Sequence, residues 1–209
     1  MNEQEPIRVL LADDHAVVQA GLAALINAEP DMTIVGRARD GLEAVNLYRT
    51  LSPDVLLLGL RMPKLDGLGV IKELFARDRR VKVLILTMFD GDQDIVRPLK
   101  AGAKGYLLMD TLPDQVLDAV RAVHAGKSVV PPEVAARVAE HLSSESLTQR
   151  ELDVLRSIAG GRANKEIAYE LEVSEGTVKT HVCNLLQKLR CGSRAEAVAV
   201  AIKRGFLRL

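Results

Sequence analysis

The first part of the chain alternates short apolar runs with longer segments whose apolar residues recur every three or four positions. The short runs have the length of strands, and the longer segments have the spacing of amphipathic helices. Repetition of this strand–helix unit predicts an α/β doubly wound parallel sheet. The expected strands are residues 7–12, 32–35, 54–58, 81–86 and 104–108, and the expected helices are residues 15–28, 41–51, 67–76, 92–101 and 113–125.

The strand at residues 54–58 is followed directly by a glycine. Its unbroken apolar run is typical of a strand buried on both faces in the middle of a parallel sheet. Ligand sites in such sheets lie just beyond the carboxyl ends of the strands. Gly59 occupies that position, although it has no side chain with which to bind or react.

The pattern changes after Gly126, where a proline pair interrupts the chain. From Leu147 onward no strand pattern remains, and Thr148 and Glu151 form a capping box at the start of a helix. We therefore expect an α/β domain at residues 1–127, a linker with a short helix at 128–146 (helix 133–142, polar linker 143–146), and an all-α domain at 147–209 with helices ending near residues 159, 171, 189 and 204.

The formal net charge is zero, but the two halves differ. Residues 145–209 carry 11 Lys and Arg against 8 Asp and Glu, whereas residues 1–144 carry 17 against 20. From Gly176 onward, seven basic residues stand against one acidic residue. This asymmetry indicates a basic surface for nucleic acid at the C-terminal end, although a solvated helix surface would produce the same counts.

Three features favour a cytoplasmic protein with no membrane partner. Cys183 and Cys191 are too few for a secreted disulfide framework. The segment 1–6 has two acidic residues and no basic one, unlike the start of a signal peptide. No apolar run approaches the roughly 18 residues that are needed to cross a bilayer.

Polar residues mark several ends of the predicted strands. Asp13 and Asp14 follow the first strand, Thr87 follows the fourth, and Lys104 begins the fifth. We expect all four to lie on one edge of the sheet. Paired carboxylates are suitable ligands for Mg²⁺, and an ammonium with a hydroxyl can hold the oxygens of a phosphoryl group. Either aspartate alone would equally serve as a helix cap.

Residues 6–127 resemble the receiver domain of bacterial response regulators. The resemblance rests on Asp13-Asp14, Leu60-Arg61-Met62-Pro63, Asp66-Gly67, Thr87 and Lys104-Gly105-Tyr106. It implies a five-stranded sheet in the order 2-1-3-4-5 and a sensor histidine kinase as partner. It also implies Mg²⁺ ligation by Asp13, Asp14 and the Arg61 carbonyl, switching by Thr87 and Tyr106, and a phosphoryl contact from Lys104.

This chain departs from the family at the phosphoacceptor, because the position of the family's aspartate is Gly59. Glycine can form no acyl phosphate, and the loss of one carboxylate should weaken Mg²⁺ binding. Asp54 begins the strand and is too distant to substitute, while Asp66 before Gly67 reads as a helix cap. The otherwise intact site favours an Asp-to-Gly change, while a naturally phosphorylation-independent regulator remains an alternative.

Residues 147–207 resemble the LuxR-type helix-turn-helix of the NarL/FixJ family. The resemblance includes Asn164-Lys165-Glu166-Ile167-Ala168 and Thr177-Val178-Lys179-Thr180-His181-Val182. It implies a DNA-binding transcription regulator. A recognition helix over residues 175–189 would enter the major groove of double-stranded DNA. The expected DNA-binding residues are Asn164, Lys165, Thr177, Lys179, Thr180, Cys183, Asn184, Lys188 and Arg194.

The last helix is more apolar than one small core requires, and this favours a homodimer that binds paired half-sites. The sequence also agrees with two rival functions. A Mg²⁺-dependent phosphohydrolase would use Asp13 or Asp14 as nucleophile, whereas a phosphate-blind scaffold would act through protein contacts alone. The sequence does not reveal the operator, the partner kinase, or whether binding activates or represses transcription.

Overall fold

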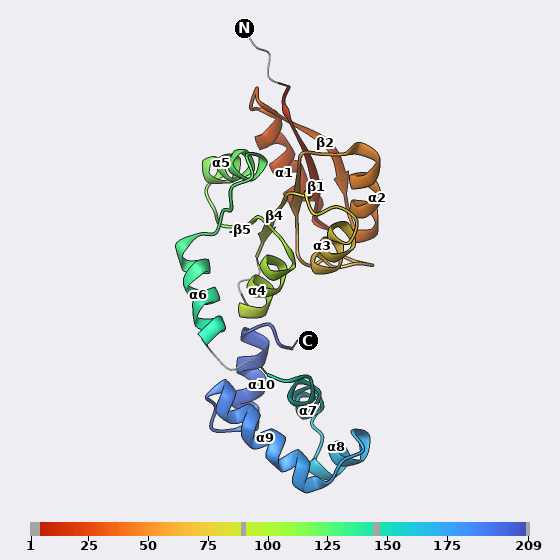
Figure 1. Cartoon of the computed structure of the whole chain (residues 1–209), viewed down its shortest axis with the longest axis vertical. Helices are drawn as coiled ribbons and strands as arrows, with labels where there is room; N and C mark the ends of the chain where they lie inside the picture. Colours follow the sequence, from red (N-terminus) through yellow and green to blue (C-terminus); the bar gives the residue numbers. More distant parts are fainter. Residues whose placement is uncertain (1–4, 89–90, 144–146, 208–209) are drawn as a thin grey trace. The chain divides into compact units, whose positions relative to one another are not determined.

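The computed structural model describes residues 5–88, 91–143 and 147–207, and Figure 1 shows the course of the chain. Strands and helices alternate up to residue 124, and only helices follow. The elements are β1 Ile7–Ala12, α1 Ala16–Asn27, β2 Met32–Ala38, α2 Gly41–Leu51, β3 Val55–Leu58, α3 Gly67–Phe75, β4 Val83–Thr87, α4 Asp92–Ala101, β5 Gly105–Leu108, α5 Pro113–His124, α6 Pro132–Ser143, α7 Gln149–Ala159, α8 Asn164–Glu170, α9 Glu175–Leu189 and α10 Arg194–Lys203.

Every predicted strand and helix is present, but β2 is longer than its apolar pattern suggested. It continues through Gly36 to Ala38 because, after a register shift between Val9 and Leu10, these residues pair with the second half of β1. A Cβ atom at position 36 would lie 2.6 Å from Leu51 Cδ1, so a larger residue there would require the Leu51 side chain to shift. Residues 144–146 of the predicted linker lie outside the described residues.

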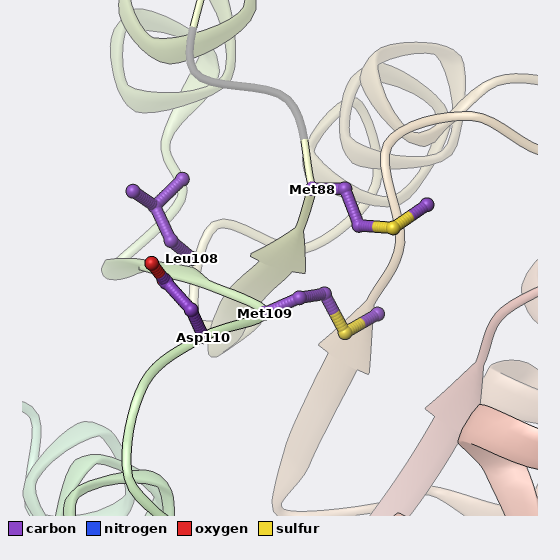
Figure 2. Close-up of a pocket in the computed structure, with 4 residues that line it drawn as sticks. All are labelled: Met88, Leu108, Met109 and Asp110. Atoms are coloured by element: carbon purple, nitrogen blue, oxygen red, sulfur yellow. The ribbon is translucent and has the colours of Figure 1, made fainter.

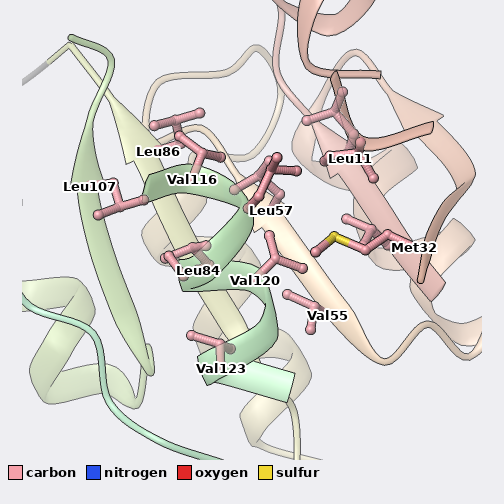
Figure 3. Close-up of a cluster of buried hydrophobic side chains, with 14 residues drawn as sticks. Leu11, Met32, Val55, Leu57, Leu84, Leu86, Leu107, Val116, Val120 and Val123 are labelled. Atoms are coloured by element: carbon pink, nitrogen blue, oxygen red, sulfur yellow. The ribbon is translucent and has the colours of Figure 1, made fainter. Parts of the chain in front are cut away.

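The five strands form a parallel sheet in the order β2-β1-β3-β4-β5, which confirms the predicted fold class. Their carboxyl ends therefore share one edge. One face of the sheet packs against α1 and α5, with Val116, Val120 and Val123 of α5 lying over the central strands (Figure 3). Burial of these apolar side chains stabilises the sheet and thereby fixes the positions of the residues at its carboxyl edge.

The chain forms two compact units. The main boundary between them along the chain falls between Ala135 and Ala136, inside α6. The second unit has a separate core, to which α7, α8, α9 and α10 all contribute. Thr148 and Glu151 form the predicted capping box of α7, and Ser174 and Ser193 cap α9 and α10 through their side chains. In the part of the chain that the structure describes, no helix is long and apolar enough to span a membrane.

Candidate functional site

The acidic pair follows the end of β1, as predicted. Asp13 is 6% exposed, and its Oδ1 accepts a hydrogen bond of 2.8 Å from the backbone N–H of His15. Gln19 supports the turn because its Nε2 donates to the carbonyl oxygens of Asp13 and Ala38, each at 2.6 Å. Asp14 is exposed next to it. Burial and hydrogen bonds therefore fix one carboxylate, while the other faces solvent.

His15 connects the two carboxylates and was not singled out from the sequence. Its Nδ1 lies 3.1 Å from Asp13 Oδ1 and 2.9 Å from Asp14 Oδ1. The histidine directly follows the two aspartates, and only this adjacency in the sequence pointed to it. A positive charge on the imidazole would lower the repulsion between the two carboxylates, and their oxygens are of the type that Mg²⁺ binds.

Gly59 directly follows β3, next to the acidic pair. Its N–H donates to the Ala12 carbonyl at 2.8 Å, which continues the pairing of β3 with β1. A Cβ atom at position 59 would lie only 2.7 Å from Asp13 Oδ2. A side chain at position 59 would therefore require the Asp13 carboxylate to shift.

Thr87 and Tyr106 belong to the neighbouring strands and are both buried. Thr87 ends β4 and is 3% exposed, while Tyr106 lies within β5 and is fully buried. Thr87 pairs with Leu108, at the carboxyl end of β5. Thr87 therefore lies on the predicted edge, and Tyr106 lies inside the sheet behind it.

The expectation that Lys104 lies on this edge is wrong. Lys104 immediately precedes β5, and its N–H donates to the carbonyl oxygen of Val83, the first residue of β4. In a parallel sheet the beginning of a strand lies at the amino edge, whereas Thr87 ends its strand. Four residues separate Lys104 from Leu108, which corresponds to about 13 Å along the strand. Lys104 is therefore not brought to the acidic pair.

The residue that directly follows β5 at this edge is Met109. Its N–H donates to the Thr87 carbonyl at 2.9 Å, and its side chain borders a narrow internal space together with Asp13 and Gly59. Polarity could not identify this position, because methionine carries no charge. The residue beside Thr87 at this edge thus carries an uncharged thioether.

Met109 also lines a pocket of about 580 Å³ at the ends of β4 and β5, together with Met88, Leu108 and Asp110. Figure 2 shows the side chains of Met88 and Met109 projecting in the same direction, while those of Leu108 and Asp110 lie apart from them. The four described lining residues supply apolar groups and one carboxylate. This side of the site therefore lacks a basic group among the lining residues that the structure describes.

The loop after β3 carries Arg61 and ends at Asp66. Asp66 caps α3 by accepting a hydrogen bond of 2.8 Å from the Gly69 N–H, which agrees with its prediction as a cap. The Arg61 guanidinium lies 3.8 Å from the Asp94 carboxylate on α4. A role of the Arg61 carbonyl in Mg²⁺ ligation stays a prediction.

In the second unit, α9 presents a polar surface as predicted. Val178, Val182 and Leu185 are buried in the core, so the side chains between them point outward. The hydroxyl of Thr180 is used within the helix, where it donates to the Gly176 carbonyl at 3.1 Å. The exposed residues on α9 include Thr177, Lys179, Thr180, Cys183 and Asn184.

Two of the predicted phosphate contacts have partners inside the protein. Lys188 Nζ lies 2.9 Å from Glu151 Oε2, and its side chain is only 17% exposed. This arrangement favours a packing role for Lys188 over a DNA contact. Arg194 Nη2 donates to Asn164 Oδ1 at 2.6 Å, while Lys165 beside them is exposed.

Residues 9–121 match the response regulator receiver domain, and residues 145–201 match the luxR family of bacterial regulatory proteins. The transcriptional regulatory protein YxjL of Bacillus subtilis is 40% identical, over 98% of this chain and 99% of the relative. The nitrate/nitrite response regulator NarL of Escherichia coli K12 is 38% identical, over 94% and 95%.

Among solved structures, RcsB dimers bound to two parallel DNAs are similar with a TM-score of 0.72 and 25% identity, over 95% of this chain and 99% of RcsB. These relatives are regulators of transcription and not enzymes, which argues against the phosphohydrolase. The two matched domains, their order and the full-length relatives agree with one another. The chain belongs to the NarL/FixJ family of response regulators and is a DNA-binding regulator of the two-component type.

Proposed function

We propose that this chain regulates transcription without accepting a phosphoryl group at position 59. The observation that carries the proposal is that position 59, directly after β3 and beside Asp13, is a glycine and supplies no carboxylate. An acyl phosphate requires a carboxylate, and backbone alone supplies none. In this proposal a sensor histidine kinase finds no acceptor at the end of β3.

Met109 supports the same proposal independently. A phosphoryl group at this edge would need a cation to hold its oxygens, and the residue beside Thr87 and Gly59 is uncharged. The absence of a carboxylate at position 59 and of a cation at position 109 together favour a regulator that is naturally phosphorylation-independent over a single Asp-to-Gly change. This reverses the preference that the sequence suggested, because that preference assumed an intact site around Gly59.

Mg²⁺ fits the remaining acidic pair only in part. Asp13 and Asp14 offer carboxylate oxygens, but the third carboxylate is missing and His15 competes for both. We infer a weakened Mg²⁺ site. When bound, the ion would supply positive charge beside the two aspartates and no covalent chemistry.

The partner is double-stranded DNA, read by the exposed side of α9, and the active form is a homodimer. The dimer is inferred from RcsB, whose structure contains dimers bound to DNA. Val198, Val200 and Ile202 pack partly against the core of their own unit, so only part of the apolar surface of α10 is left for a second copy. A cytoplasmic location follows from DNA as the partner.

The direct test is treatment of the purified protein with acetyl phosphate and Mg²⁺. We expect no mass increase of one phosphoryl group, measured on the intact protein at neutral pH. A Gly59→Asp/Met109→Lys variant, which returns a carboxylate and an ammonium, is the positive control and should gain the group. A stoichiometric phosphoryl adduct on the unaltered protein would contradict the proposal.

A further inference from the structure

Arg194 and Asn164 are far apart in the sequence but meet in the DNA-binding unit. Asn164 is the first residue of α8, and Arg194 is the first residue of α10. The guanidinium Nη2 of Arg194 donates to the amide oxygen of Asn164 over 2.6 Å. Both side chains are half-buried, so this bond is partly protected from competing water.

The bond determines which way the Asn164 amide faces. A guanidinium has only donors, so the amide oxygen must point to Arg194 and the NH₂ group must point away. In the described part of the chain, this NH₂ group donates to no protein atom. The amide is not the cap of α8 either, because Ala163 occupies the N-cap position and its N–H donates to Glu166 Oε2 at 2.7 Å.

We propose that Arg194 is a positioning residue for DNA binding, which holds the Asn164 amide so that its NH₂ group donates to a phosphate oxygen of the DNA backbone. The inference rests on the DNA-binding function. Beyond their mutual bond, the two side chains present only N–H donors, and the exposed ammonium of Lys165 follows directly. Such a donor-only surface matches phosphate, which only accepts hydrogen bonds.

The competing explanation is that the bond only ties α8 to α10. Asn164→Asp tests the donor role, because aspartate still accepts from Arg194 but places an oxygen and a negative charge where the NH₂ group faced outward. Binding of the full-length variant to a fluorescein-labelled duplex of mixed sequence is measured by anisotropy at about 50 mM salt. We expect affinity about tenfold weaker than that of the unaltered protein, together with an unchanged or higher melting temperature.

Five further variants test the coupling. Asn164→Ala and Arg194→Ala should each weaken binding, and the double variant should lose no more than the larger single loss. Arg194→Gln, which can still donate to the amide oxygen, should recover part of the affinity lost in Arg194→Ala. Lys203→Gln is the matched control, because it removes one exposed positive charge from α10 away from Asn164, and it should lose less than Arg194→Ala.

The outcomes are distinguishable. If the unaltered protein does not bind the duplex, the DNA-binding function itself fails. If it binds and Asn164→Asp binds equally well, the inference is overturned and the bond is only a tie between helices. Additive losses in the double variant, or an equal loss in Lys203→Gln, would also overturn it. If Asn164→Asp does not fold, the double-variant cycle and Arg194→Gln still decide.

Discussion

At the scale of single residues, the side chain of Asp13 lies directly beside Gly59. Oδ2 of Asp13 lies where it would contact a Cβ atom at position 59, and Oδ1 accepts from the N–H of His15. A third acidic group would add like charge to a place where one carboxylate is already almost fully buried. A carboxylate at position 59 would therefore need either a shift of Asp13 or a compensating cation.

Gly59→Asp should destabilise the protein by about 1–2 kcal/mol in the absence of divalent cations, because Asp13 must move and two carboxylates come close together. Mg²⁺ should recover most of this loss. The measurement is the melting temperature with EDTA and with Mg²⁺. Gly59→Ala is the matched control, since it adds the Cβ atom without charge and should show no Mg²⁺-dependent recovery.

Lys188→Ala should destabilise the second unit by about 3 kcal/mol, measured by urea unfolding, because it leaves the Glu151 carboxylate buried without its cation. Lys179→Ala on the exposed side of the same helix is the control and should change stability by less than about 0.5 kcal/mol. A reduction in DNA affinity for Lys188→Ala at full stability would instead restore Lys188 as a DNA contact.

Glu151 also predicts a pH dependence. Burial raises the pKa of its carboxyl group, but the hydrogen bonds from Lys188 and Thr148 outweigh burial and leave the pKa below its usual value. Because the folded pKa is lower than the unfolded one, Glu151 contributes stability above the unfolded value, and this contribution is lost as the pH falls through the folded value. Glu151→Gln should therefore show a smaller loss of stability between neutral and acidic pH, measured by urea unfolding at several pH values.

The residues of the receiver site were only partly predictable from the sequence. Asp13, Asp14 and Thr87 were found because polar side chains interrupt apolar strands at their carboxyl ends. Lys104 was misplaced because its charge was considered without the direction of its strand, and it begins β5 instead of ending it. Met109 was missed because an apolar residue at a strand end gives no signal until the register is known.

At the scale of elements, the loop after β3 packs against the start of α2 and forms an ion pair with it. Lys64 Nζ lies 2.6 Å from Asp40 Oδ2, and Asp40 also caps α2 by accepting from the Glu43 N–H at 2.9 Å. Gly41 lies against the same loop, where a Cβ atom would approach the Leu65 carbonyl oxygen to 1.9 Å. The close contact of these two elements places the loop that contains Arg61.

Gly41→Ala should destabilise the first unit by about 2 kcal/mol, since the new methyl group meets backbone that cannot move without shifting the loop. Gly21→Ala is the matched control, because a Cβ atom there meets nothing within 4 Å and alanine favours the helix. Thermal unfolding of both variants gives the comparison. Equal stability of the two variants would show that the loop yields easily.

Helix starts were predictable because their capping residues are local in sequence, as with Asp66 and Thr148. Strand ends were less accurate. Gly36 to Ala38 belong to β2 through pairing with β1, and this pairing is not visible in a local pattern of apolar and polar residues.

At the scale of the whole molecule, each unit has its own core, and among the described residues the members of the second core all lie within 147–207. A fragment of residues 143–209 should therefore fold and bind DNA alone, with affinity that falls as salt rises. Circular dichroism and anisotropy measure the two properties. A folded fragment that binds no DNA at low salt would contradict assignment of DNA binding to this unit.

The glycine after β3 affects how long a response lasts. An aspartyl phosphate hydrolyses, so a regulator that carries one returns to its unphosphorylated form and its response ends. Under the proposed function this chain has no such intrinsic limit on its response. The duration of its effect on transcription would then follow its rates of synthesis and degradation, and the cell would end the response by removing the protein.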